Sequence, residues 1–338
     1  MSRSIRQSTR FPIGEIVGVI AVGLSGLLFA QLDMPLLQSL MAQALILSFL
    51  AFGIGYLIRM TGWVSFGHAG PFGLGAYGVA LAFSGPGPAP EVMLLLIIPG
   101  VTLLYFLVGL VVSRLEGIGF AMLTLALGQG LFVAATKFRA VTGGSDGIAV
   151  SLPRRLFGLT TDLLQQPHGM LVFALSFLLI VYVFLRLFER SHLGRLTVAI
   201  RENEERARFL GYRTRALRAA VYGISCGIAS IGGVLFGLYQ GFVSPDVLTW
   251  GMSGSGLIMA ILGGSSFLWG PIVGAIVFFF TREWLTENTD HWLAILGIAL
   301  IVIMVLWPKG LSGGVERLLA RLRTGSGPVP VELRRKAA

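Results

Sequence analysis

The sequence predicts an all-α polytopic membrane protein with about 8–10 transmembrane helices, including short or re-entrant segments. Of its 338 residues, 55% are hydrophobic and only 12% are charged, whereas a soluble domain has roughly 25% charged residues. The mean hydropathy is +0.82. The apolar residues form long runs, and most charged residues fall in a few short segments between or after these runs.

The apolar runs define the expected spans, because a helix needs roughly 20 apolar residues to cross a bilayer. We expect spans at approximately 14–32, 35–58, 70–84, 91–113, 118–136, 169–188, 218–242, 253–263, 271–285 and 291–307. Three of them are short. The sequence leaves open whether segments 70–84, 253–263 and 271–285 cross or re-enter.

The basic residues predict the orientation. The net charge is +10, and segment 186–218 has nine arginines against four glutamates, while residues 308–338 have seven basic residues against two acidic ones. Because basic segments are retained in the cytoplasm, we expect a cytoplasmic basic N-terminus (1–13), a transmembrane domain (14–307) with a cytoplasmic loop at 186–218, and a cytoplasmic tail. This distribution does not indicate nucleic-acid binding.

The centre of that loop, residues 194–211, is expected to form one short helix with a glycine at each end. Glu202 with Arg206, and Glu204 with Arg208, have the i,i+4 spacing that stabilises an isolated helix by about 0.2–0.5 kcal/mol per pair. Two interpretations remain open at this point. The segment is either a solvated, self-paired connector or a docking helix for a soluble partner.

A weak internal repeat suggests a transport pathway. Ser65–Pro71 and Ser266–Pro271 both place Gly-Pro at the start of a short apolar segment, each at the expected inner side. Paired broken segments are typical of carrier pathways, although Gly-Pro also simply starts helices. The candidate pathway residues are small or neutral: Ser65, Phe66, Gly67, His68, Gly70, Gly263, Gly264 and Ser265.

Several chemistries are excluded. One cysteine, Cys226, cannot form an intrachain disulfide or a multi-thiolate metal site, and the four histidines are scattered. A proton-coupled carrier needs ionisable residues within its spans, whereas the spans of this chain contain almost none away from their ends. None of the three lysines is followed by Ser or Thr, so the chain has no P-loop. These observations indicate the membrane subunit of a machine whose ATPase is a separate chain.

Several motifs occur in order between residues 40 and 313. They are Gly62–Tyr77, Gly143–Gly147, Gly194–Glu204, Ser244-Pro245, Gly263-Gly264 with Gly270-Pro271, and Pro308–Leu311. Together they resemble the LivM-type permease of bacterial ABC importers for branched-chain and other hydrophobic amino acids. Pro71 departs from the family pattern as an additional residue before Phe72. Arg201-Glu202-Asn203 favours the M-type over the sister H-type subunit.

The resemblance implies a permease domain in the bacterial inner membrane that pairs with a second, LivH-like permease subunit. Two cytoplasmic LivG/LivF-like ATPases would drive it, and a periplasmic binding protein would supply it. The chain itself would hold no cofactor, because ATP and magnesium bind to the partner ATPases. No residue is expected to be catalytic or to bind a metal.

The resemblance also assigns residues to two contacts. The ATPase-coupling residues would be Gly194, Arg195, Ala199, Arg201, Glu202, Asn203, Glu204 and Gly211. A periplasmic loop would contain Gly144, Ser145, Asp146 and Gly147, as an ordinary outer turn or as a contact for the binding protein.

Other functions remain open. A permease of the same architecture for urea, short amides or aromatic acids is the main rival, and a stand-alone channel or secondary carrier is the alternative from a different class. A membrane enzyme fits least, since no acid, base and nucleophile converge.

Overall fold

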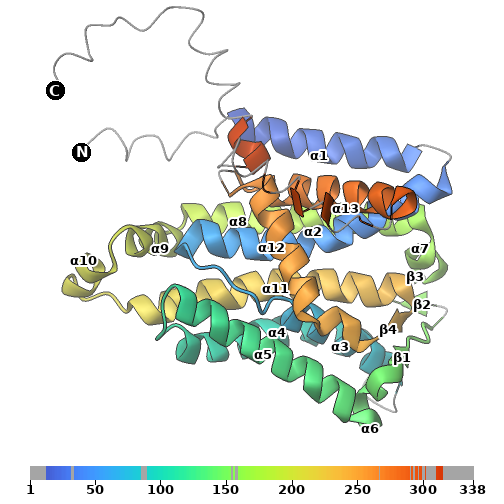
Figure 1. Ribbon diagram of the computed structural model, residues 1–338, viewed down its shortest axis with the longest axis horizontal. Helices are drawn as coiled ribbons and strands as arrows, with labels where there is room; N and C mark the ends of the chain where they lie inside the picture. Colours follow the sequence, from blue (N-terminus) through green and yellow to red (C-terminus); the bar gives the residue numbers. More distant parts are fainter. Residues whose placement is uncertain are drawn as a thin grey trace, which may run out of the picture.

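The protein, seen in a computed structural model, is a bundle of α-helices (Figure 1). The structure describes residues 13–31, 34–84, 90–153, 155–156, 159–265, 267–289, 291, 294–295, 297–298, 301 and 310–314. The main helices of the bundle are α1 (Ile13–Gln31), α2 (Pro35–Thr61), α3 (Ala69–Ser84), α4 (Pro90–Val112), α5 (Ile118–Lys137), α8 (Pro167–Arg190), α11 (Thr214–Gln240), α12 (Trp250–Gly263) and α13 (Gly270–Asn288).

Most of these helices lie within a few residues of the expected spans. Five of them are long and apolar enough to cross a membrane: Pro35–Thr61, Pro90–Val112, Ile118–Lys137, Pro167–Arg190 and Thr214–Gln240. Ala69–Phe83 and Trp250–Gly263 are shorter apolar helices. The expected span at 291–307 lies largely outside the described residues. The fold is therefore that of an all-α polytopic membrane protein.

Helix α11 is the centre of the bundle and packs against α2, α3 and α4. Glycines allow the backbones to approach closely, as is common where lipid removes the hydrophobic drive for helix association. A Cβ at Gly233 of α11 would collide with the carbonyl oxygen of Phe72 in α3, and one at Gly53 of α2 with the carbonyl oxygen of Ser225 in α11. The core is consequently dense around α11.

The two ends of the bundle are formed by different elements (Figure 1). At one end lie α9 (His192–Glu202) and α10 (Glu204–Phe209). At the other, β1 (Ile148–Ala149) pairs antiparallel with β4 (Phe242–Val243). The second end also holds α6 (Arg139–Thr142), η2 (Gly144–Asp146), α7 (Asp162–Gln165), η3 (Pro245–Leu248) and the hairpin of β2 (Arg155–Leu156) with β3 (Leu159–Thr160). We refer to these as the α9–α10 end and the β1–β4 end.

The two Gly-Pro turns lie at different depths in the bundle, and the expectation that both lie at the inner side of the membrane stays a prediction. The turn after α2 runs back into the bundle before α3 begins, and His68 there reaches Ser225. Ser225 lies eleven residues into α11, or about 16 Å along the helix. The turn between α12 and α13, in contrast, contacts Arg59 near the α9–α10 end through Ser265.

Replacing Gly233 with alanine tests this close packing. The added Cβ meets backbone atoms of Phe72 that cannot rotate away, so we expect a loss of about 1–3 kcal/mol or more in stability. Thermal unfolding of the detergent-purified chain measures it. Gly100→Ala in α4, where a Cβ meets nothing within 4 Å, is the matched control and should leave the melting temperature unchanged or raised.

Candidate coupling face

The polar segment 194–211 is not a single helix, so that prediction is wrong. Asn203 separates α9 from α10, and its side-chain oxygen accepts a hydrogen bond from the Arg206 backbone N–H at 2.8 Å. Ser191 caps α9 by accepting from the Gly194 backbone N–H at 3.1 Å. Asparagine side chains compete in this way with helix continuation. Gly194 is therefore a buried residue within α9 rather than a break before it.

Of the two expected i,i+4 ion pairs, one is present. Arg208 lies 3.2 Å from Glu204, but no ion pair joins Glu202 to Arg206 among the described residues. The break at Asn203 places these two side chains on separate helices. After α10 the exposed Gly211 turns the chain with a φ of +83°, a left-handed conformation that favours glycine.

Glu204 fixes α10 to α11. Its carboxylate pairs with Arg218 and accepts a hydrogen bond from the Thr214 hydroxyl at 2.9 Å. Arg218 is itself buried, lies 2.9 Å from Glu116 and stacks its guanidinium 4.8 Å from the Trp63 ring centroid. Burial by itself raises the pKa of Glu204, but its hydrogen bonds and the charge of Arg218 outweigh this and lower the pKa below its ordinary value.

A second group of charges joins α1, α2 and α8 near the same end. Glu15, which is only 1% exposed, lies 3.6 Å from Arg59 and 3.7 Å from Arg186. Glu189 lies 2.7 Å from Arg59 and 3.0 Å from Arg186. Two carboxylates and two guanidiniums thus balance one another, and we call these four residues the charge cluster. Tyr182 donates a hydrogen bond to Glu15 at 2.9 Å.

The charge cluster also holds α9 and the α12–α13 turn. Arg201 donates to the backbone carbonyl of Arg59 at 2.6 Å, which attaches the end of α9 to the end of α2. Arg59 donates to the Ser265 carbonyl at 3.1 Å, and Glu15 accepts from the Leu268 backbone N–H at 3.3 Å. No sequence motif indicated Glu15. The signal that could have found it is a lone carboxylate in the first turn of an apolar run.

One face of α9 is left exposed. Arg195, Val198, Ala199 and Glu202 follow the i, i+3, i+4, i+7 spacing of a helical stripe and are all exposed. We call these four residues the outward stripe. The opposite face is buried through Gly194, Thr197 and Ile200.

The candidate pathway residues after α2 are packed inside the chain. His68 is fully buried, with its ring nitrogens 2.9 Å from the Ser65 hydroxyl and 3.1 Å from the Ser225 hydroxyl. The half-buried Phe66 donates its backbone N–H to Thr124. A Cβ at Gly67 would collide with the Thr124 carbonyl. A role of this turn in a pathway stays a prediction.

The remaining candidate pathway residues are equally closely packed. Gly70 and Gly263 are buried, and a Cβ at either would collide with a neighbour: the Tyr105 hydroxyl for Gly70 and the Gly270 carbonyl for Gly263. Gly264 ends α12 with a φ of +79°. Ser266 of the repeat lies outside the described residues.

The candidate loop at the β1–β4 end is tightly folded. Gly143, Gly144 and Gly147 have φ values of +71°, +67° and +71°, and Gly147 lies against the carbonyl of Val243 in β4. Ser145 and Asp146 remain exposed at the tip. The loop is therefore a tight turn, with the polar groups of Ser145 and Asp146 available to solvent.

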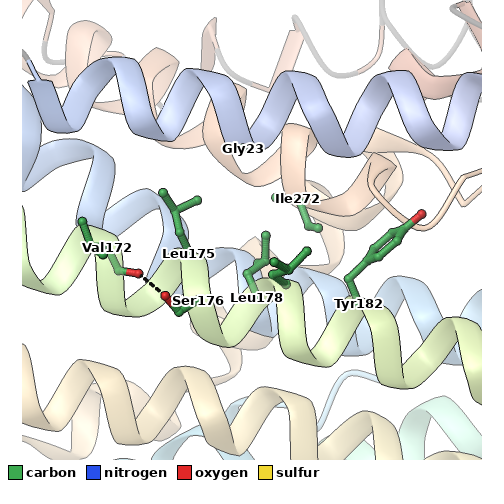
Figure 2. Close-up of a pocket in the computed structure, with 8 residues that line it drawn as sticks. Gly23, Val172, Leu175, Ser176, Leu178, Tyr182 and Ile272 are labelled. Atoms are coloured by element: carbon green, nitrogen blue, oxygen red, sulfur yellow. Dashed lines mark hydrogen bonds between the residues drawn. The ribbon is translucent and has the colours of Figure 1, made fainter.

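A cavity of about 230 Å³ lies between α1 and α8 and is lined mainly by apolar groups (Figure 2). Ser176 donates its hydroxyl to the Val172 carbonyl, and the Tyr182 hydroxyl is bonded to Glu15. A zwitterion would find no free polar partner among these lining residues, and burying charge without one is costly. The cavity is not suited to bind an amino acid.

These features define the class: a multi-pass α-helical membrane protein with a polar helical hairpin fixed to one end of the bundle. Within that class, the chain belongs to the branched-chain amino acid transport system / permease component family, which matches residues 36–305. The family is one of transport permease subunits. No solved structure is significantly similar to the chain.

Individual relatives agree with the family. The chain is 30% identical over 289 residues to the high-affinity branched-chain amino acid transport system permease protein LivM of Escherichia coli (strain K12), covering 78% of this chain and 66% of that protein. The same protein of Salmonella typhimurium is 29% identical with the same coverage. The chain thus spans just under two thirds of these relatives. The autoinducer 2 import system permease protein LsrC of Escherichia coli is 29% identical over 177 residues, 52% of this chain and 47% of that protein.

Glu189→Gln tests the charge cluster. It leaves two guanidiniums facing one carboxylate, so we expect a loss of roughly 1–3 kcal/mol in stability, seen as a lower melting temperature of the purified chain. Glu202→Gln is the matched control, because Glu202 is exposed at the end of α9. Equal melting temperatures for the two variants would show that the charge cluster contributes nothing to stability.

Proposed function

We propose that the chain is the membrane-spanning permease subunit of an ABC importer for branched-chain or other hydrophobic amino acids. The match of residues 36–305 to the permease family carries the proposal, and the names of the LivM relatives support the substrate class. ATP hydrolysis, with its nucleotide and magnesium, belongs to separate ATPase subunits.

We assign the α9–α10 end and both chain termini to the cytoplasm. The excess of basic residues in segments 186–218 and 308–338 supports this orientation. The β1–β4 end then faces the periplasm. The exposure of Ser145 and Asp146 at this end supports a contact with a periplasmic binding protein.

The outward stripe of α9 is the surface that would seat on an ATPase. Its opposite face is buried against the bundle, and Arg201 ties α9 to the end of α2. Glu204 and Arg218 tie α10 to α11 in the same way. A displacement of the hairpin would therefore be passed to α2 and α11 instead of being absorbed by a loose connection.

The substrate pathway is proposed to lie between this chain and a second permease subunit. The cavity beside α1 is apolar, and a second cavity of about 370 Å³ between α4, α8 and α11 is also lined by apolar residues. The turn at Ser65–Gly70 is filled by its own packing contacts. Alternating access would then come from tilting two chains against each other.

Two alternatives remain. The LsrC relatives are named for another cargo, so a permease of the same architecture for urea, short amides or aromatic acids stays a candidate. A stand-alone channel or carrier would not need the anchored hairpin with its outward stripe, and would purify without ATPase subunits.

Altering the outward stripe tests the coupling proposal. We expect Ala199→Asp with Glu202→Lys to abolish co-purification of ATPase subunits and ATP-dependent uptake, because both residues are exposed and neither supports the bundle. Glu287→Lys, an exposed charge reversal at the far end of α13, should retain the ATPases. Normal co-purification with the altered stripe would remove the assignment.

Competitive uptake by cells expressing the chain with its genomic neighbours tests the substrate class. We expect unlabelled leucine and phenylalanine to inhibit uptake of labelled leucine, whereas urea does not, because the proposed cargo is a hydrophobic amino acid. Uptake of labelled urea that leucine fails to inhibit would assign the chain to the rival class.

A further inference from the structure

A third cavity differs from the two apolar ones by its charge. It has a volume of about 410 Å³ and lies where α4 ends and where α10 is followed by α11. Its lining includes four arginines: Arg114, Arg208, Arg213 and Arg215. We call it the basic cavity. All four arginines are exposed, so the cavity is open to a ligand from outside the chain.

The charges of the basic cavity are not balanced within the described part of the chain. Arg208 pairs with Glu204, but that carboxylate is shared with Arg218 and Thr214. Arg114, Arg213 and Arg215 have no ion-pair partner among the described residues. The charge cluster, in contrast, contains equal numbers of acids and bases. The basic cavity therefore attracts an anion.

The basic cavity lies at the depth of a membrane surface. Arg114 follows the end of α4 by two residues, and Arg213 immediately precedes α11; both helices are candidate membrane spans. Tyr212, a residue type common at membrane–water interfaces, also lines it. The expected ligand is therefore an anion found at the membrane–water interface.

An exposed apolar stripe on α4 leads from the basic cavity along the bundle. Leu103, Leu107 and Leu110 are 59%, 52% and 36% exposed and share one helix face by their i, i+4, i+7 spacing. Leu110 itself lines the cavity. Acyl chains along this stripe would place a phosphate among the arginines.

We propose that the basic cavity binds the headgroup of an anionic phospholipid. Guanidinium groups match phosphate geometry, and basic pockets between transmembrane helices recognise such headgroups. An ATPase subunit fits less well, because the apolar stripe continues from the cavity toward the bilayer. The site goes beyond the proposed function and requires neither a particular cargo nor transport.

Lipid affinity measured by native mass spectrometry tests the site on the full chain with its co-purifying subunits. We expect phosphatidylglycerol to bind more tightly than phosphatidylcholine. Arg213→Gln with Arg215→Gln should weaken phosphatidylglycerol binding by about tenfold, and raised salt should weaken it in the unaltered chain. Arg213→Lys with Arg215→Lys keeps both charges but not the guanidinium geometry, so it should lose less affinity than the glutamine variant.

Arg206→Gln with Arg282→Gln is the matched control, since both arginines are exposed, neither lines the cavity and neither belongs to the outward stripe. An equal loss of lipid affinity in this control would overturn the proposal, as would equal binding of the two lipids. Displacement of phosphatidylglycerol by low-millimolar inorganic phosphate would assign the cavity to a free anion. Loss of ATPase subunits from the Arg213 and Arg215 variant with unchanged lipid affinity would assign it to a protein. Either result overturns the lipid site.

Discussion

The charge cluster of Glu15, Arg59, Arg186 and Glu189 is the interaction on which the arrangement of the α9–α10 end depends. Removing one partner of these largely buried ion pairs leaves an uncompensated charge, at a cost of roughly 1–3 kcal/mol. The ends of α1, α2 and α8 therefore stabilise one another through these ion pairs. The α12–α13 turn and α9 are attached to the same residues through backbone groups of Leu268 and Arg59.

Hydropathy was sufficient to predict the helices but not where they turn. The expected spans at 118–136 and 14–32 agree within one residue with the helices Ile118–Lys137 and Ile13–Gln31. They agree because membrane thickness fixes the length of an apolar run. The break at Asn203 was not predicted, because strong helix formers surround it and a side-chain cap decides the outcome. The pairing of β1 with β4 depends on two segments about 90 residues apart, which no local pattern reveals.

For the site residues too, local sequence patterns predicted position but not long-range contacts. Motif order identified the hairpin and the glycine turns, but not their contacts. His68 reads from sequence as a polar group open to a pathway, whereas its contact with Ser225 is formed across 157 residues of chain and leaves the ring buried. Glu15 reads as an ordinary helix-end carboxylate, because its importance depends on Arg59 and Arg186, which come from two other helices.

The hairpin of α9 and α10 is attached to the bundle at two points. Arg201 fixes α9 to the end of α2, and Glu204 with Arg218 fixes α10 to the start of α11. Helices α2 and α11 in turn pack against each other, with Gly53 allowing the α2 backbone to approach Ser225. A force on the outward stripe therefore reaches two joined helices at once. Because packed helices resist bending and shift as units, the expected response to a displacement of α9 and α10 is a joint tilt of α2 and α11.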